Sequence, residues 1–169
     1  MNKKTAVRTT RASALAVVAA LASAGAWAAD NDTQTVSFTI SAINEIDVAA
    51  GPVNLTINSA TAGSQPTAAT AASSYSITTN AAADSKRITA QLDTAMPANV
   101  TLQVSVDAPS AGSSSAGTVT LSNTAADVVT GVETVIASGV AINYTLSATI
   151  DATPVTDSRT VTYTIVDAS

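Results

Sequence analysis

The chain has 169 residues, which suits one domain with a substantial core, and it carries a formal net charge of −5. It contains neither cysteine nor histidine, which excludes disulfides, thiol nucleophiles and imidazole, the commonest general base and metal ligand. An acidic balance also disfavours binding to phosphate backbones and to anionic membrane surfaces.

Residues 1–28 have the three parts of a secretory signal peptide. A basic start is followed by an apolar stretch over residues 12–21 and by the small-residue site Ala26-Trp27-Ala28; the basic residues are Lys3, Lys4, Arg8 and Arg11. The apolar stretch is shorter than the roughly 20 residues that span a bilayer. We therefore predict cleavage after Ala28, no membrane insertion afterwards, and a bacterial protein that is secreted or lies at the cell surface or in the periplasm.

Cleavage changes the charge of the protein, because four of its seven basic residues lie in the signal peptide. Only Lys86, Arg87 and Arg159 remain against twelve acidic residues, a net charge of −9. No basic cluster is left to bind nucleic acid. We predict that residues 29–169 form a single domain without a nucleic-acid partner.

The first predicted element of this domain is a half-buried strand over residues 33–40. Val36, Phe38 and Ile40 alternate with hydroxyl residues and so share one face. A strand close to the new N-terminus can complete its own sheet or that of a neighbouring molecule. The three apolar residues are therefore candidate assembly residues.

Period-2 apolar patterns continue along the chain and predict further strands, separated by a loop over residues 58–74, a turn at residues 96–99 and a Ser/Gly-rich loop over residues 109–117. One helical turn is predicted over residues 124–129, and Gly139 is predicted to break a strand. The predicted apolar faces are Ile46 and Val48; Val53, Leu55 and Ile57; Tyr75 and Ile77; Ile88, Ala90 and Leu92; Val100, Leu102, Val104 and Val106; Val119 and Leu121; Val135; Ile142, Tyr144, Leu146, Ala148 and Ile150; and Val161, Tyr163 and Ile165.

These eight or nine short antiparallel strands predict an all-β fold. Alternating faces with turn residues between them are typical of a two-sheet, immunoglobulin-like β-sandwich. A closed barrel is the alternative.

No pattern of catalytic residues is found, and we predict that the protein is not an enzyme. Lys86 is the one lysine of residues 29–169 and starts a predicted strand, where a solvated charge explains it better than a Ser-Lys catalytic pair. The carboxylates that could serve a glycosidase fall at turns and strand ends, where solvation and turn hydrogen bonds account for them; they are Asp93, Asp107, Asp127, Glu133, Asp151 and Asp157.

Calcium is the one metal that this composition permits, because it binds carboxylate and carbonyl oxygens. Asp30-Asn31-Asp32 and the pair Glu45 and Asp47 could contribute ligands, but neither matches a twelve-residue calcium loop. Solvated acids explain both, and we predict no cofactor and no metal site.

The C-terminal run from Thr160 to Ala168 resembles the closing strand of WxL-type surface domains, with Tyr163 where that pattern usually has tryptophan. The order of a signal peptide, Thr/Val-rich strands and an aromatic-containing terminal strand also resembles bacterial fimbrial subunits and matrix-fibre proteins. This resemblance implies a structural protein of the cell surface. The missing tryptophan and the missing cysteine pair are departures from these patterns.

Two functions follow as hypotheses. The first is a subunit of a filament, fimbria or biofilm matrix that associates with itself or with other surface proteins by β-strand pairing. Residues Val36, Phe38 and Ile40 would insert into a neighbour, or the edge at Val161, Tyr163 and Ile165 would receive a strand. The second is a secreted carbohydrate-binding or adhesin module that uses the loops at residues 58–74 and 109–117, although it has few aromatic residues to stack on sugars.

Overall fold

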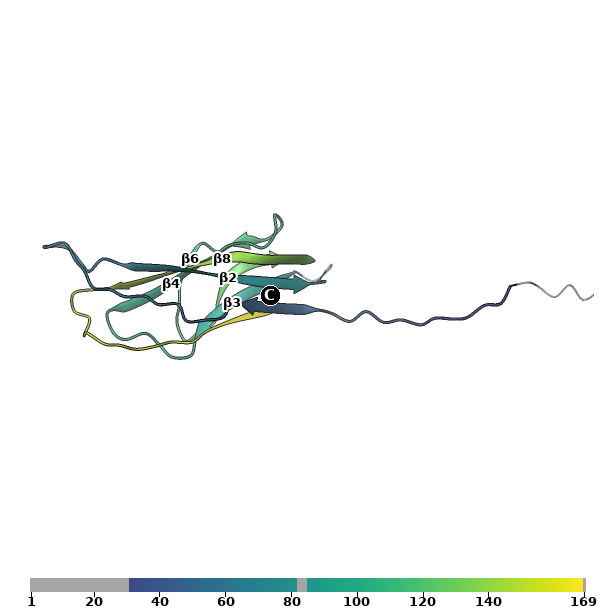
Figure 1. Ribbon diagram of the computed structural model, residues 1–169, viewed down its shortest axis with the longest axis horizontal. Coiled ribbons are helices and arrows are strands. Elements are labelled where there is room, and N and C mark those ends of the chain that lie inside the picture. The colour runs from purple at the N-terminus through teal and green to yellow at the C-terminus, as the bar shows by residue number, and fades with distance from the viewer. Residues whose placement is uncertain (1–30, 82–84, 169) are drawn as a thin grey trace, which may run out of the picture. The chain divides into compact units, whose positions relative to one another are not determined.

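The computed structural model describes residues 31–81 and 85–168, and the strands within them are all antiparallel. They lie in one compact unit, residues 39–169, and these described residues contain no helix (Figure 1). The described residues 31–38 belong to a second unit. The strands are β1 (Asn44–Val48), β2 (Ala69–Thr79), β3 (Lys86–Leu92), β4 (Val100–Val106), β5 (Ser114–Ser115), β6 (Thr118–Thr120), β7 (Ala126–Val132), β8 (Val135–Ala148) and β9 (Val161–Asp167).

The strands form two sheets, which confirms the predicted β-sandwich. One sheet has the order β1-β2-β8-β4-β6 and the other the order β5-β7-β3-β9. Each sheet has two edge strands within the described residues, so the closed barrel is wrong.

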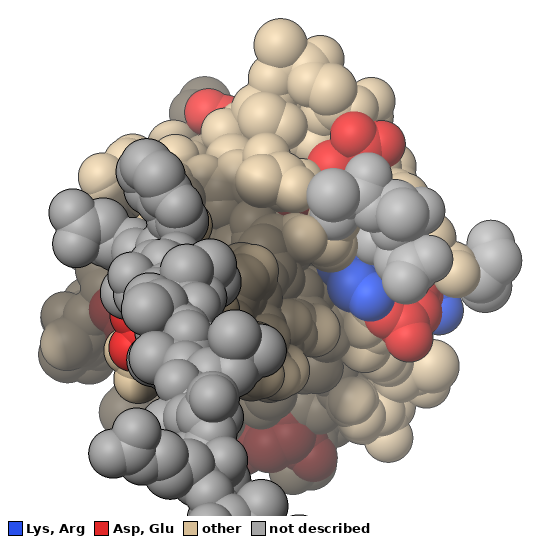
Figure 2. Space-filling model, turned by 90° about the vertical axis from the view of Figure 1, so that its right-hand side faces the viewer, with Lys and Arg blue, Asp and Glu red and all other residues tan. Residues whose placement is uncertain are grey.

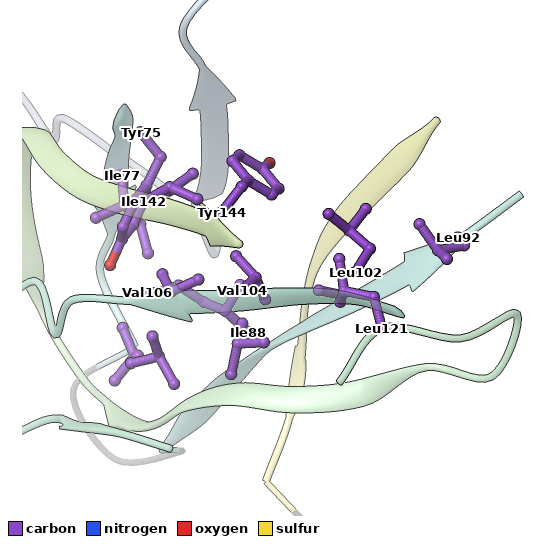
Figure 3. Packing of buried hydrophobic residues seen from close by; sticks show 14 residues of the cluster. Tyr75, Ile77, Ile88, Leu92, Leu102, Val104, Val106, Leu121, Ile142 and Tyr144 are labelled. Carbon is purple, nitrogen blue, oxygen red and sulfur yellow. The ribbon is translucent and has the colours of Figure 1, made fainter. Parts of the chain in front are cut away.

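The core lies between the two sheets and is built from the alternate residues of the long strands. Ile88, Ala90 and Leu92 of β3 are at most 1% exposed and belong to one cluster with residues of the facing sheet such as Val104 and Ile142. Figure 3 shows Ile88 close to Val104. Burial of one such aliphatic side chain contributes about 1.5–3 kcal/mol. The buried core therefore consists mainly of Val, Ile, Leu and Ala side chains.

Three tyrosines lie in or against the core and form hydrogen bonds through their hydroxyls. Tyr75 is 1% exposed, and its hydroxyl donates to the backbone oxygen of Asp107 at 2.7 Å. The hydroxyls of Tyr144 and Tyr163 lie 2.8 Å apart, which joins β8 of one sheet to β9 of the other. Buried phenols are expected to find such partners.

Gly139 was predicted to break a strand, and this is wrong, because β8 runs without interruption from Val135 to Ala148. Gly139 has φ 66°, and the register between β2 and β8 shifts beside it, from Tyr75 opposite Val140 to Ile77 opposite Ala137. An extra residue with a left-handed glycine is a β-bulge. The glycine therefore bends a continuous strand.

Two further predictions are corrected in the second half of the chain and in the first loop. The predicted helical turn at residues 124–129 is instead part of β7, where Val128 and Val129 are fully buried in the core. The predicted loop at residues 58–74 ends earlier, because β2 already begins at Ala69 and pairs with β8 from that residue. Small and polar residues can form a strand where a long neighbouring strand pairs with them, as β8 does here.

The predicted strand at Val53, Leu55 and Ile57 is also wrong, because residues 49–59 belong to no strand. The chain leaves β1 with one last ladder bond, in which the nitrogen of Ala49 donates to the oxygen of Ser74 at 2.9 Å. Gly51 then takes φ 112°, a conformation that favours glycine, and Pro52 follows it. The pairing with β2 therefore ends here, although the alternation of side chains continues.

Candidate assembly surfaces

The N-terminal arm, defined here as residues 33–40, forms no strand, which corrects the prediction of a half-buried strand. Its apolar side chains are not buried: Val36 is 76%, Phe38 83% and Ile40 77% exposed. A period-2 pattern reports which side chains share a face, but a strand also needs a hydrogen-bond partner. The arm thus carries an apolar face that the described structure leaves exposed.

Asn80 holds the segment that joins the arm to β1. Its side-chain oxygen accepts from the backbone nitrogen of Ile43 at 2.8 Å, and its side-chain nitrogen donates to the backbone oxygen of Ser41 at 2.9 Å. Its own backbone nitrogen donates to the oxygen of Ile43 at 3.2 Å. These three hydrogen bonds fix the chain immediately after the arm.

Four sheet edges are open to another strand within the described residues, and three of them are short or charged. β5 has 2 residues and β6 has 3, too few for a long ladder. β1 has 5 residues, and Glu45 and Asp47 are exposed on it. Short strands and charges are the usual protection of an edge against unwanted pairing.

β9 is the fourth edge and has neither protection along most of its length. It has 7 residues, pairs with β3 on one side, and carries no charge before Asp167. Its exposed positions before Asp167 are the hydroxyl residues Thr162 and Thr164. β9 is therefore the sheet edge best suited to accept a strand.

The predicted acceptor residues Val161, Tyr163 and Ile165 all lie on the inward face of β9. They are partly buried and pack against the core. Burial raises the pKa of the Tyr163 phenol, and its hydrogen bond to Tyr144 raises it further. These side chains thus fix the position of β9, while the backbone of its free edge is the part that a partner would meet.

The few basic side chains are held by acidic partners. Lys86 and Asp167 form an ion pair between the ends of β3 and β9, and Arg87 lies 3.3 Å from Asp127. The Arg159 guanidinium lies 2.7 Å from Asp157. On the face seen in Figure 2, the blue atoms adjoin red ones. Lys86 is therefore placed as one member of an ion pair at a strand end.

Ionisation of two carboxylates reflects these contacts. The backbone nitrogen of Ser158 donates to Asp157, and this bond, followed by the contact with Arg159, lowers the pKa of Asp157. The hydrogen bond from Lys86 lowers the pKa of Asp167. Both groups are solvent-exposed, and their ionisation is explained by local pairing.

Only part of the candidate calcium ligands lies within the described residues. Glu45 and Asp47 are exposed on the edge strand β1, whereas Asp30 lies outside the described residues. Among residues 31–81 and 85–168, no three acidic side chains gather in a group that could hold a metal ion. In the same residues, no helix is long and apolar enough to cross a bilayer.

Comparisons with protein-family models, with curated proteins and with solved structures found no match to this chain. Its function is therefore argued from its own surfaces.

Two features of these surfaces were not predicted. Nothing in the local sequence distinguishes Asn80, because its role depends on contacts with residues 37 to 39 positions away. The free backbone of Val53–Ile57 was missed because the same alternation predicted a paired strand. The adjacent Gly51-Pro52 indicated only that the chain turns there.

Proposed function

We propose that this protein is an exported, non-enzymatic structural subunit of the bacterial cell surface, of the kind that builds a filament, fimbria or biofilm matrix. Copies associate by β-strand pairing: the arm of one copy adds to the free edge of β9 in the next. The observation that carries the proposal is the exposure of Val36, Phe38 and Ile40, three apolar side chains spaced for one face of a strand.

Strand addition accounts for both the exposed apolar arm and the free edge of β9. Backbone hydrogen bonds to the edge supply affinity, and alternate side chains supply register. Burial of the three arm side chains contributes roughly 5–9 kcal/mol before the cost of ordering the arm is subtracted. That contribution is large enough to hold copies together.

The charges of the chain support β9 over the other sheet edges. The arm and residues 161–166 contain no charged residue, so pairing them removes no charge from water. β1 is disfavoured, because a strand added beside Glu45 and Asp47 would have to accommodate two carboxylates. The acidic remainder of the surface repels other copies and so limits association to the uncharged elements.

Electron microscopy and sedimentation of the exported protein over a range of concentrations test the proposal. Its intact mass first checks that cleavage follows Ala28. We expect concentration-dependent fibres or oligomers from the unaltered protein. A protein that stays monomeric at every concentration would contradict the proposal.

An arm variant with Val36→Ser, Phe38→Ser and Ile40→Ser should remain folded and monomeric. Its matched control carries Ile136→Ser and Ile150→Ser, which change side chains that are 85% and 72% exposed on the sandwich unit. The control should assemble like the unaltered protein. Equal loss of assembly in both variants would show that general surface hydrophobicity, and not the arm, drives association.

A further inference from the structure

The free edge of β9 presents a defined set of backbone groups. The pairing of β9 with β3 is regular along its whole length, and just before β9 the nitrogen of Asp93 donates to the oxygen of Thr160 at 3.0 Å. Backbone groups of successive strand residues point to opposite sides. The even-numbered residues of β9 therefore bond to β3, whereas Val161, Tyr163 and Ile165 direct their N–H and C=O groups to the free edge.

The side chains of the same three residues of β9 are covered only in part. The β3 residues opposite them are Ile88, Ala90 and Leu92, which are at most 1% exposed, whereas the three side chains of β9 are partly buried. Side chains on the same face of neighbouring strands pack against one another. A strand beside β9 with apolar residues on its inward face would therefore complete the cover of this margin of the core.

The arm leaves the sandwich at the end where β9 ends. The side chain of Asn80, directly after β2, donates to the backbone oxygen of Ser41 at 2.9 Å. β3 begins six positions after Asn80, at Lys86, which pairs with Asp167, the last residue of β9. In Figure 1 the yellow loop of residues 149–160, which leads into β9, lies at the left, away from the label C. β9 thus runs toward the end from which the arm leaves.

The arm can therefore reach the β9 of its own copy only in the parallel direction. Ile40 is bonded to Ser41 and lies near the Asp167 end of β9, whereas antiparallel pairing would need it beside Val161, six residue steps or about 20 Å away. The strand pairs of the described residues are all antiparallel. That direction is also slightly more stable per residue, and for the arm it is available only between copies.

We propose that the arm of a second copy adds to β9 in the antiparallel direction, with Phe38 opposite Tyr163. This inference rests on the proposed function and gives the direction and register of its contact. Directly opposite residues share a face, so three apolar pairs lie on the inward side: Val36 with Ile165, Phe38 with Tyr163, and Ile40 with Val161. Each pair also exchanges backbone hydrogen bonds, because the free groups of β9 belong to these residues.

The two strands fit this register in length and in polarity. The arm has eight residues and β9 has 7, and neither carries a charge before Asp167. A shift by one residue would turn the three apolar side chains of the arm to the solvent face. In the proposed direction each copy uses its arm on one neighbour and its β9 on another, so copies join head to tail and the chain stays open.

Cysteine pairs on the solvent face test both direction and register, because the chain has no native cysteine. In the proposed contact Thr39 lies opposite Thr162, and Ser37 lies opposite Thr164. These pairs exchange no backbone hydrogen bond, so their Cα atoms are about 4.5 Å apart, within the range of a disulfide. A parallel contact with the same central pair would exchange the partners.

Copies with Thr39→Cys are mixed with copies that carry either Thr162→Cys or Thr164→Cys, and are oxidised under assembly conditions. Copies with Ser37→Cys are treated in the same way, and heterodimers are identified by intact mass. The Thr39 with Thr162 and Ser37 with Thr164 combinations should give roughly tenfold more heterodimer than the exchanged ones, whose side chains lie about 7–8 Å apart. A chain with both Thr39→Cys and Thr162→Cys should give a ladder of covalent oligomers.

All four positions are exposed hydroxyl residues, so each variant should unfold at the same urea concentration as the unaltered protein. More heterodimer from the exchanged combinations would show a parallel contact and overturn the inference. Equal linkage of all combinations, or none, would overturn the register. In these cases the proposed function stands if the arm variant fails to assemble, and it is wrong if the arm variant assembles like the unaltered protein.

Discussion

Substitution of Ile40 separates the role of the arm from that of surface hydrophobicity in general. Ile40 and Ile150 are the same residue type and are almost equally exposed, at 77% and 72%. Replacement of either by alanine removes three carbon atoms. In the folded monomer both changes should alter the free energy of unfolding by less than about 0.5 kcal/mol, because both side chains already face water.

The two substitutions should differ in assembly. Three carbon atoms contribute about 2.4 kcal/mol on full burial, and the exposed fraction of Ile40 leaves roughly 2 kcal/mol to be gained in the contact. Ile40→Ala should therefore raise the critical concentration for assembly about 20- to 30-fold. Ile150→Ala should leave it within about twofold, since the free energy of the contact is unchanged.

The assay is sedimentation of assembled material over a dilution series, with urea unfolding measured below the critical concentration. Two results would refute the reasoning. One is an Ile40→Ala protein that assembles at the concentration of the unaltered protein. The other is an Ile150→Ala protein that shows the same loss, because the effect would then follow exposed apolar area and not the arm.

Three further measurements check the structure itself. Burial raises the pKa of all three tyrosines, so their contribution to stability is complete below about pH 10 and is lost above it, by up to about 1.4 kcal/mol per pH unit for each phenol; alkaline unfolding without this decline would contradict their burial. Asn80→Ala should speed hydrogen exchange at Ile43, because the side-chain oxygen of Asn80 accepts a hydrogen bond from the Ile43 amide; unchanged exchange would show that this hydrogen bond does not form. Leu92→Ala should cost about 2–5 kcal/mol and Ile136→Ala less than about 0.5, because Leu92 is 1% and Ile136 85% exposed; equal losses in urea unfolding would contradict the assigned core.

Much of the sandwich follows from the sequence because its long strands are paired on both sides or packed on one face. Ile88, Ala90 and Leu92 are buried where alternation predicts them, and the same holds for β4. The failures at Gly139, at Val53–Ile57 and in the arm share one physical cause. Alternation predicts which residues share a face, but pairing depends on segments that are distant in the chain. Gly139 therefore looks like the end of a strand in the sequence, although β8 continues past it because it stays paired with β2.

The candidate assembly residues show the same limit of what side-chain alternation can predict. The sequence identified Val36, Phe38 and Ile40 as one face but could not indicate that they would be exposed. The pattern at Val161, Tyr163 and Ile165 suggested an edge that could receive a strand, but only the strand order shows that β9 is the outermost strand of its sheet, beside β3. Which strand lies at an edge is decided by the order of strands in a sheet, and that order is a property of the whole chain.

The arm, Val53–Ile57 and β9 share one local pattern, yet only β9 is paired, and on one side alone. An uncharged edge with free backbone groups can pair with any extended chain. A short strand or a charge prevents such pairing, and these features protect β1, β5 and β6. Protection at three edges makes the bare fourth edge a specific feature of this chain. A strand that covers it would satisfy the backbone of β9 and remove the apolar face of the arm from water in one contact, which is why we propose that the protein acts through that edge.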